Sequence, residues 1–136
     1  MADETQTQQV QEVSEHDSIF LTVKIGCDVE PDDTAFDTKL LMYINSYLQV
    51  LWLQGVGKSG FRVTDSTQTW GDFLGPNIEH LQMAYTYVCD KVRLAFDPPQ
   101  SSALYNAIKE QANELGYYLR VESDILDRED DDDEED

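Results

Sequence analysis

Basic residues are scarce in this chain. Its 136 residues include nine Lys and Arg against 28 Asp and Glu, which gives a net charge of −19. Proteins that bind nucleic acid through its phosphates carry a basic patch or stripe. Lys91 and Arg93 are only two positive charges in a strongly acidic chain. The sequence therefore does not predict a nucleic-acid-binding surface.

Cysteine and histidine are equally scarce, with two of each at Cys27, Cys89, His16 and His80. Their spacing fits neither a pair of disulfide partners nor a zinc site, so we expect free, buried thiols and no metal. The acidic run 28–33 lacks the twelve-residue loop with a central Gly that binds calcium. No Ser/His/Asp or Cys/His grouping has a local signature. We therefore expect no enzyme, no catalytic residue and no cofactor.

Long apolar runs are also missing. No segment reaches the ~18 consecutive apolar residues of a membrane-spanning helix. The first residues lack the basic start and the apolar stretch of a secretion signal. We therefore expect neither a membrane anchor nor a signal peptide.

The acidic charge is unevenly placed along the chain. Residues 1–17 carry −5, residues 127–136 carry −8, and the longer middle, 18–126, carries only −6. A dense acidic run repels itself and has little to bury. We therefore predict a flexible acidic N-terminal extension at 1–17, a folded domain at 18–126 and a disordered acidic tail at 127–136.

The spacing of apolar residues predicts a mainly α fold. Residues 18–29 form a short helix ending near Gly26, or alternatively a strand, because β-branched residues are frequent there. Three longer segments show apolar residues every three or four positions. They predict helices at about 35–53, 77–96 and 103–122. The expected architecture is a small helical bundle of three long helices and a short N-terminal helix.

The segment 58–76, between the first two long helices, differs in kind. Its alternating apolar residues and many Gly, Ser and Thr predict a β-hairpin or ordered loop, with strands at about 61–63 and 67–70. Two readings of its aromatic residues stay open. Trp70 and Phe73 either pack back onto the helices or act as anchors of a subunit interface.

The run KVRLAFDPPQSS (91–102) predicts a break between the second and third long helices. Asp97 precedes a proline, which disfavours the helical conformation, and Pro98 and Pro99 lack the amide hydrogens that a helix needs. Ser101 or Ser102 can then cap the next helix. These residues predict a helical hairpin.

Four segments in this order resemble the head–tail connector (adaptor) proteins of tailed bacteriophages. They are DDTAFDTKLLMYINSYLQVLWLQGVG (32–57), GFRVTDSTQTWGDFL (60–74), YVCDKVRLAFDPPQSS (87–102) and ALYNAIKEQANELGYYLRV (103–121). Each motif is weak alone, and their order and spacing make the match specific. The resemblance covers about 19–122.

The resemblance implies a structural protein of the virion neck, made in the host bacterial cytoplasm. Its copies would form a ring, normally twelve-fold, beneath the portal protein. The ring would extend the DNA channel, let DNA pass without specific binding, and meet a downstream tail or stopper protein. We expect the contacts on the 58–76 insert and the third helix, at the residues Phe61, Trp70, Phe73, Leu74, Tyr117, Tyr118 and Arg120.

An alternative function rests on charge alone. An acidic chain can mimic DNA and occupy the basic groove of a nucleic-acid-processing protein. Most of the charge lies on the two ends, whereas a mimic needs it patterned on the folded surface. The acidic segment 127–136 is either a solubility feature or, as we expect, a docking segment for a basic surface of the portal or tail partner.

Overall fold

The computed structural model describes residues 17–135, with side chains described through residue 130. Every named element among them is a helix, which confirms the mainly α prediction. In chain order the elements are α2 (Ile19–Gly26), α3 (Asp37–Leu53), α4 (Trp70–Leu74), the 3-10 helix η1 (Gly75–His80), α5 (Met83–Phe96) and α6 (Ser102–Glu135). The prediction for residues 1–17 lies, apart from Asp17, outside the described residues.

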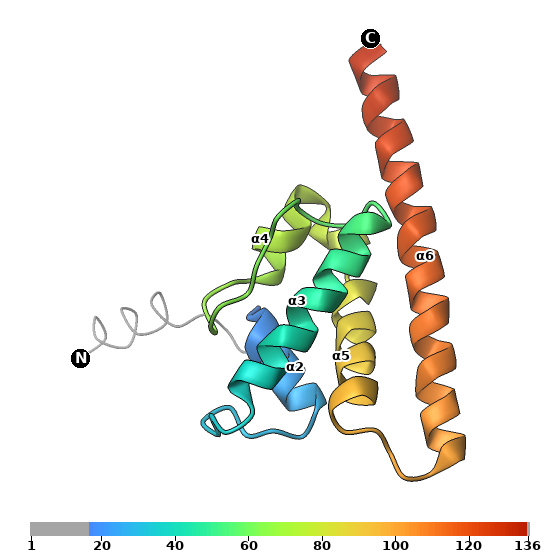
Figure 1. Ribbon diagram of the computed structural model, residues 1–136. Coiled ribbons are helices and arrows are strands. Elements are labelled where there is room, and N and C mark those ends of the chain that lie inside the picture. Colours follow the sequence, from blue (N-terminus) through green and yellow to red (C-terminus); the bar gives the residue numbers. More distant parts are fainter. Residues whose placement is uncertain (1–16, 136) are drawn as a thin grey trace, which may run out of the picture.

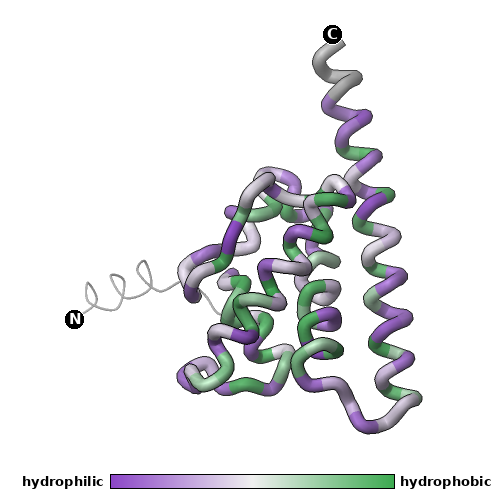
Figure 2. The backbone as a smooth tube through the Cα atoms, viewed as in Figure 1, coloured by the Kyte–Doolittle hydropathy of each residue, from purple (hydrophilic) through white to green (hydrophobic). Residues whose placement is uncertain are grey.

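Helix α5 occupies the centre of the fold, with α2 and α3 on one side and α6 on the other (Figure 1). Figure 2 shows apolar segments gathering where α2, α3 and α5 meet. The core there includes Ile19, Val23, Leu40, Ile44, Leu48, Leu51, Ala84, Val88 and Val92. Burial of these side chains is the main force that holds the short helices together.

Helix α6 lies against α5 through small residues. Ala112 is fully buried, and a Cβ atom on Gly116 would lie 3.0 Å from the ring of Tyr87. A larger residue at Gly116 would push the Tyr87 ring away. These two small residues therefore let the long helix pack closely over Tyr87.

The 58–76 insert contains no β-hairpin, so this prediction was wrong. Within the described residues its only bridge is a single antiparallel pairing of Thr69 with Ser18. Val63 instead pairs with a side chain of α3: its N–H donates to Asn45 Oδ1 at 2.7 Å, and its carbonyl accepts from Asn45 Nδ2 at 2.9 Å. One asparagine thus supplies both hydrogen bonds that a neighbouring strand would have supplied.

The second half of the insert is helical. Thr69 caps α4 by accepting from the Asp72 N–H at 3.1 Å, and the Asp72 carboxylate accepts from the Thr69 N–H at 3.1 Å. This reciprocal capping box satisfies amides that a short helix leaves free. The second long helix was predicted to run without interruption from residue 77. In the structure this stretch is divided into η1, which ends at His80, and α5, which begins at Met83.

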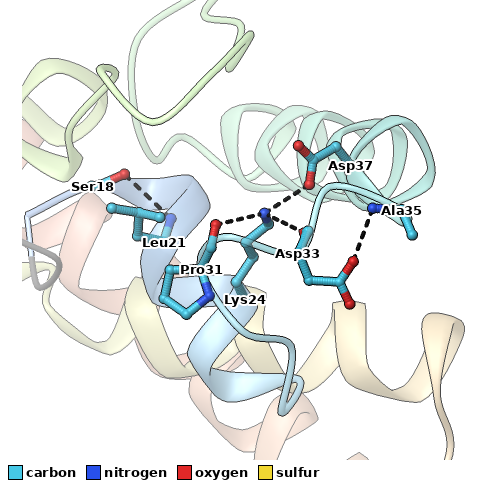
Figure 3. Close-up of polar contacts among 7 residues, drawn as sticks. All are labelled: Ser18, Leu21, Lys24, Pro31, Asp33, Ala35 and Asp37. Carbon is cyan, nitrogen blue, oxygen red and sulfur yellow. Dashed lines mark hydrogen bonds and ion pairs between the residues drawn. The ribbon is translucent and has the colours of Figure 1, made fainter.

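Lys24 joins α2 to α3 from inside the protein (Figure 3). Its side chain is 2% exposed and its ammonium lies 2.7 Å from Asp37 Oδ1, at the start of α3. The same ammonium donates to the carbonyls of Pro31 at 3.1 Å and Asp33 at 2.9 Å. A buried charge is tolerated only with such partners, so this network fixes the loop between the two helices.

Helix α5 ends at Phe96 and α6 begins at Ser102, with Asp97, Pro98 and Pro99 between them. Ser101 Oγ accepts a hydrogen bond from the Leu104 N–H at 3.3 Å, as expected for a cap. The turn reverses the chain, so that α5 and α6 run antiparallel (Figure 1).

Helix α6 continues to Glu135, well past the end predicted at Glu122. Its C-terminal part projects beyond the helical body, and the described residues of that part are mostly hydrophilic (Figures 1 and 2). The predicted end of the folded domain at residue 126 therefore falls within α6 and not at the end of a helix. The disorder of 127–136 in the free chain stays a prediction.

Candidate assembly surfaces

Three of the predicted contact residues lie inside the protein. Trp70, Phe73 and Leu74 are buried, and the Trp70 ring stacks on Tyr85 with centroids 4.5 Å apart. The Trp70 indole N–H also donates to Thr22 Oγ1 at 3.3 Å. These side chains hold the insert onto the helices, so the structure agrees with the reading in which they pack inward.

Phe61 lies at the edge of the same cluster. It is half-buried, and its ring centroid lies 5.3 Å from that of Phe73. A Cβ atom on Gly57 would lie 2.2 Å from the Phe73 ring, and Gly57 has a φ of +94°. Glycine at this position therefore lets the chain turn directly beneath the ring.

The other predicted contact residues are exposed on α6. The rings of Tyr117 and Tyr118 contact each other edge to face at 5.4 Å, and the guanidinium of Arg120 lies 5.8 Å from the Tyr117 ring. Exposed tyrosine and arginine side chains are common anchors of protein interfaces. Among the predicted aromatic contact residues, Tyr117 and Tyr118 of α6 are thus the exposed ones, whereas Phe61 of the insert is half-buried.

A groove of about 400 Å³ lies between α3, α5 and α6. Lys91 and Arg120 contribute positive charges to it, and neither forms an ion pair with another described residue. Each cation lies near a tyrosine, Lys91 at 5.9 Å from the Tyr87 ring and Arg120 near Tyr117. The two cations give this groove a local positive charge, and each cation is attracted to the face of its neighbouring tyrosine ring.

A second surface, the α6 face, follows the solvent side of α6. It consists of residues spaced by three or four positions: Glu110, Glu114, Tyr118, Val121, Ile125 and Glu129. Such spacing places them in one stripe. Tyr118 is 47% exposed and Ile125 38% exposed, although both are large and apolar enough to be buried. The α6 face thus has an apolar centre with acidic residues toward both ends.

A third surface, the α3 face, has the same spacing on α3: Lys39, Met42, Ser46, Gln49 and Leu53. Met42 is 58% exposed and Leu53 68% exposed. Beside this stripe is an open groove of about 860 Å³, the α3–insert groove, whose far wall is formed by Arg62, Val63 and Thr64.

Sequence reasoning missed the α3 face. It assigned the apolar residues of this helix to one inward stripe, beginning at Phe36. Phe36 is 43% exposed and precedes α3, whereas the other members are buried: Leu40, Ile44, Leu48 and Leu51. Met42 and Leu53 fall outside that stripe. The buried stripe already accounts for the core contacts of α3. Apolar residues outside that stripe could therefore have indicated a second apolar side on this helix.

Burial raises the pKa of several titratable groups, and the shift is largest at two cysteines and one aspartate. Burial raises the pKa of Cys27 to about 11, that of Cys89 to about 12, and that of the Asp90 carboxyl to about 6, with Arg93 partly opposing the shift at Asp90. The two cysteines are free thiols. Their raised pKa values make them weak nucleophiles at neutral pH.

Two further findings concern the described part of the chain. Its His, Cys, Asp and Glu side chains form no group of three or more that could hold a metal ion. None of its helices has the length and apolar character needed to cross a membrane.

Comparison with known proteins identifies one family. The family described as phage connector protein matches residues 19–125, which is most of the chain and includes α2 through the centre of the α6 face. No curated protein and no solved structure matches the sequence.

Proposed function

The chain belongs to the phage connector protein family, and from that membership we propose that it forms a ring beneath the portal in the neck of a tailed bacteriophage. In this position it extends the DNA channel and joins the head to the tail. The family match over 19–125 is the observation that carries the proposal. Its neighbours in the neck are the portal protein on one side and a tail or stopper protein on the other.

The shape of the protomer supports assembly into a ring. A ring needs two different contact surfaces on each copy, because every copy meets its two neighbours through unlike faces. The α3 face and the α6 face are two such surfaces, each with large apolar side chains in contact with solvent. Exposed apolar residues that follow one helix stripe are typical of interaction sites.

The charge supports a passage for DNA rather than a DNA-binding site. With a net charge of −19, the chain repels the phosphate backbone at long range. A channel wall of this kind lets DNA slide without being held. We therefore propose a structural role without catalysis.

The projecting end of α6 supplies a second contact within the neck. From Leu126 to Glu135 the helix extends about 13 Å beyond the last buried side chain among those described on α6. Its residues are almost all acidic. We propose that this end docks on a basic surface of the portal or of the tail partner. A chain truncated after Leu126 should then enter particles less efficiently, and normal incorporation would reduce the segment to a solubility feature.

Disruption of the gene in the phage tests the proposal. We expect heads that package DNA but lack attached tails, and restoration of tailed particles when the chain is supplied in trans. Mass spectrometry of purified particles should detect the chain in the restored phage. Normal tailed particles that lack the chain would contradict the proposal and would favour the DNA-mimic alternative.

A further inference from the structure

The α3 face and the α6 face are two separate surfaces. Each lies on the solvent side of its helix, away from the buried residues with which α3 and α6 pack on α5. Val50 and Gln54 on α3 line the groove toward α6, whereas Asn45, on the opposite side of α3, bonds to Val63 of the insert. Helix α3 therefore separates Val63 from the groove beside α6. The two ends of the insert nevertheless reach α6, since Lys58 and Phe73 line a pocket together with Leu126.

The two faces carry opposite charge. Lys39 begins the α3 face, and Arg62 lines the adjoining α3–insert groove. Neither side chain forms an ion pair with another described residue. The α6 face is acidic at Glu110, Glu114 and Glu129, and none of these three is paired within the described residues either.

The two faces also match in apolar content. At about 1.5 Å per residue the α3 face spans about 21 Å from Lys39 to Leu53, and the α6 face spans about 28 Å from Glu110 to Glu129. Met42 and Leu53 on one face correspond to Tyr118 and Ile125 on the other, all of them exposed. The open α3–insert groove, about 860 Å³ in volume, can receive side chains that project from a helix.

We propose that the α6 face of one copy packs into the α3–insert groove of the next copy. The opposite charge of the two surfaces and the exposed apolar residues on both favour a second copy of this chain over any other partner. The contact is heterologous, so each copy keeps one free groove and one free α6 face, and repetition with a rotation closes a ring. This inference rests on the proposed function and specifies which surfaces build the ring.

Cysteine cross-linking in phage particles tests this contact. Ser46→Cys places a thiol on the α3 face, and Val121→Cys places one on the α6 face; a short bis-maleimide then joins thiols that lie close together. The native thiols of Cys27 and Cys89 are also present in every variant. Their raised pKa values keep them weakly reactive toward the maleimide. Particles made with both single variants together should yield cross-linked dimers.

The matched controls separate a heterologous contact from a symmetric one. Particles that contain only Ser46→Cys or only Val121→Cys should give no dimer, and a chain with both substitutions should give a ladder of larger products. Dimers from one single variant would overturn the inference, as would cross-links to another virion protein. Particles that contain the chain but give no cross-link would refute the contact and leave the proposed function standing, whereas particles without the chain would refute both.

Charge reversal provides a second readout. Arg62→Glu should lower incorporation into particles about tenfold, because like charges across an interface oppose binding. Adding Glu110→Lys and Glu114→Lys to the same chain should restore much of the loss. Lys109→Glu is the control, since Lys109 is an exposed base of α6 outside the α6 face. Equal incorporation of the Arg62→Glu and Lys109→Glu variants would overturn the inference.

Discussion

Lys24 shows how one residue organises the N-terminal third of the fold. The sequence places it within an apolar run, where a lysine is unexpected. The structure buries its ammonium among Asp37 and two loop carbonyls (Figure 3). Neither its burial nor its partner could be predicted, because Asp37 lies thirteen positions away across a loop whose conformation the spacing of apolar residues does not specify.

Replacing Lys24 by methionine should destabilise the protein by about 3 kcal/mol, since it leaves Asp37 and the two carbonyls without their buried partner. The urea midpoint of unfolding measures this loss. Lys39→Met is the matched control: Lys39 is exposed and unpaired among the described residues, so its replacement should change stability by less than about 0.5 kcal/mol. Equal midpoints for the two variants would refute the role assigned to Lys24.

Asp90 makes stability depend on pH in the opposite direction to most carboxyl groups. Burial raises its pKa from 3.8 to about 6, so the folded state binds this proton more tightly than the unfolded state. Stability should therefore fall as the pH rises from about 4 to about 6, and the loss should be complete above that range.

The variant Asp90→Asn should consequently be more stable than the native protein at pH 7, by about 1 kcal/mol after allowance for the solvent exposure of the carboxyl group, and nearly equal to it at pH 4. Thermal unfolding at the two pH values measures the difference. Asp65→Asn should behave in the reverse sense, because hydrogen bonds from Thr67 lower the pKa of Asp65 and favour its charged form. A stabilisation by Asp90→Asn that is the same at both pH values would contradict burial as the cause.

At the scale of elements, the sequence predicted helices well and the insert poorly. The core stripes of α3 and α5 repeat over several turns, so tertiary packing and local pattern agree. The alternation in the insert is equally visible at Phe61 and Val63, but it has no second strand to pair with. Asn45, eighteen positions earlier, satisfies Val63 instead. A side chain on a distant helix leaves no local pattern, which is why a hairpin was expected.

Asn45→Ala should release the insert from α3. The Val63 N–H and carbonyl would lose their partners, at a cost of about 2 kcal/mol. Hydrogen exchange at the Val63 amide should become faster, whereas amides in α5 should change little. Ser46→Ala serves as the control, since its exposed hydroxyl bonds only to Met42 within α3. Unchanged protection of Val63 in Asn45→Ala would contradict this account.

The predicted end of the third long helix, at about residue 122, was also wrong, for a different physical reason. Residues 123–135 contain neither Gly nor Pro, so nothing in the sequence stops the helix. The prediction gave more weight to repulsion among the acids, which also interact unfavourably with the negative end of the helix dipole. In the structure the helix is continuous to Glu135, and its projecting end adds a charged extension to the α6 face.

At the scale of the whole molecule, the sequence predicted the family and the order of the helices. It also predicted Tyr117 and Tyr118 as contact residues, and the structure places both side chains on the exposed surface of α6. It did not predict that α3 carries a second, exposed face, because the apolar residues of α3 were assigned to a single buried stripe. The proposed pairing of the α3 face with the α6 face would link this fold to a ring.

Image reconstruction of the phage neck at side-chain detail tests the central claim most directly. The account predicts a closed ring of this chain between the portal and the tail, with the α6 of each copy packed against α3 and the insert of the next. Neck density that is fully explained by other proteins, with no copy of this chain, would contradict it.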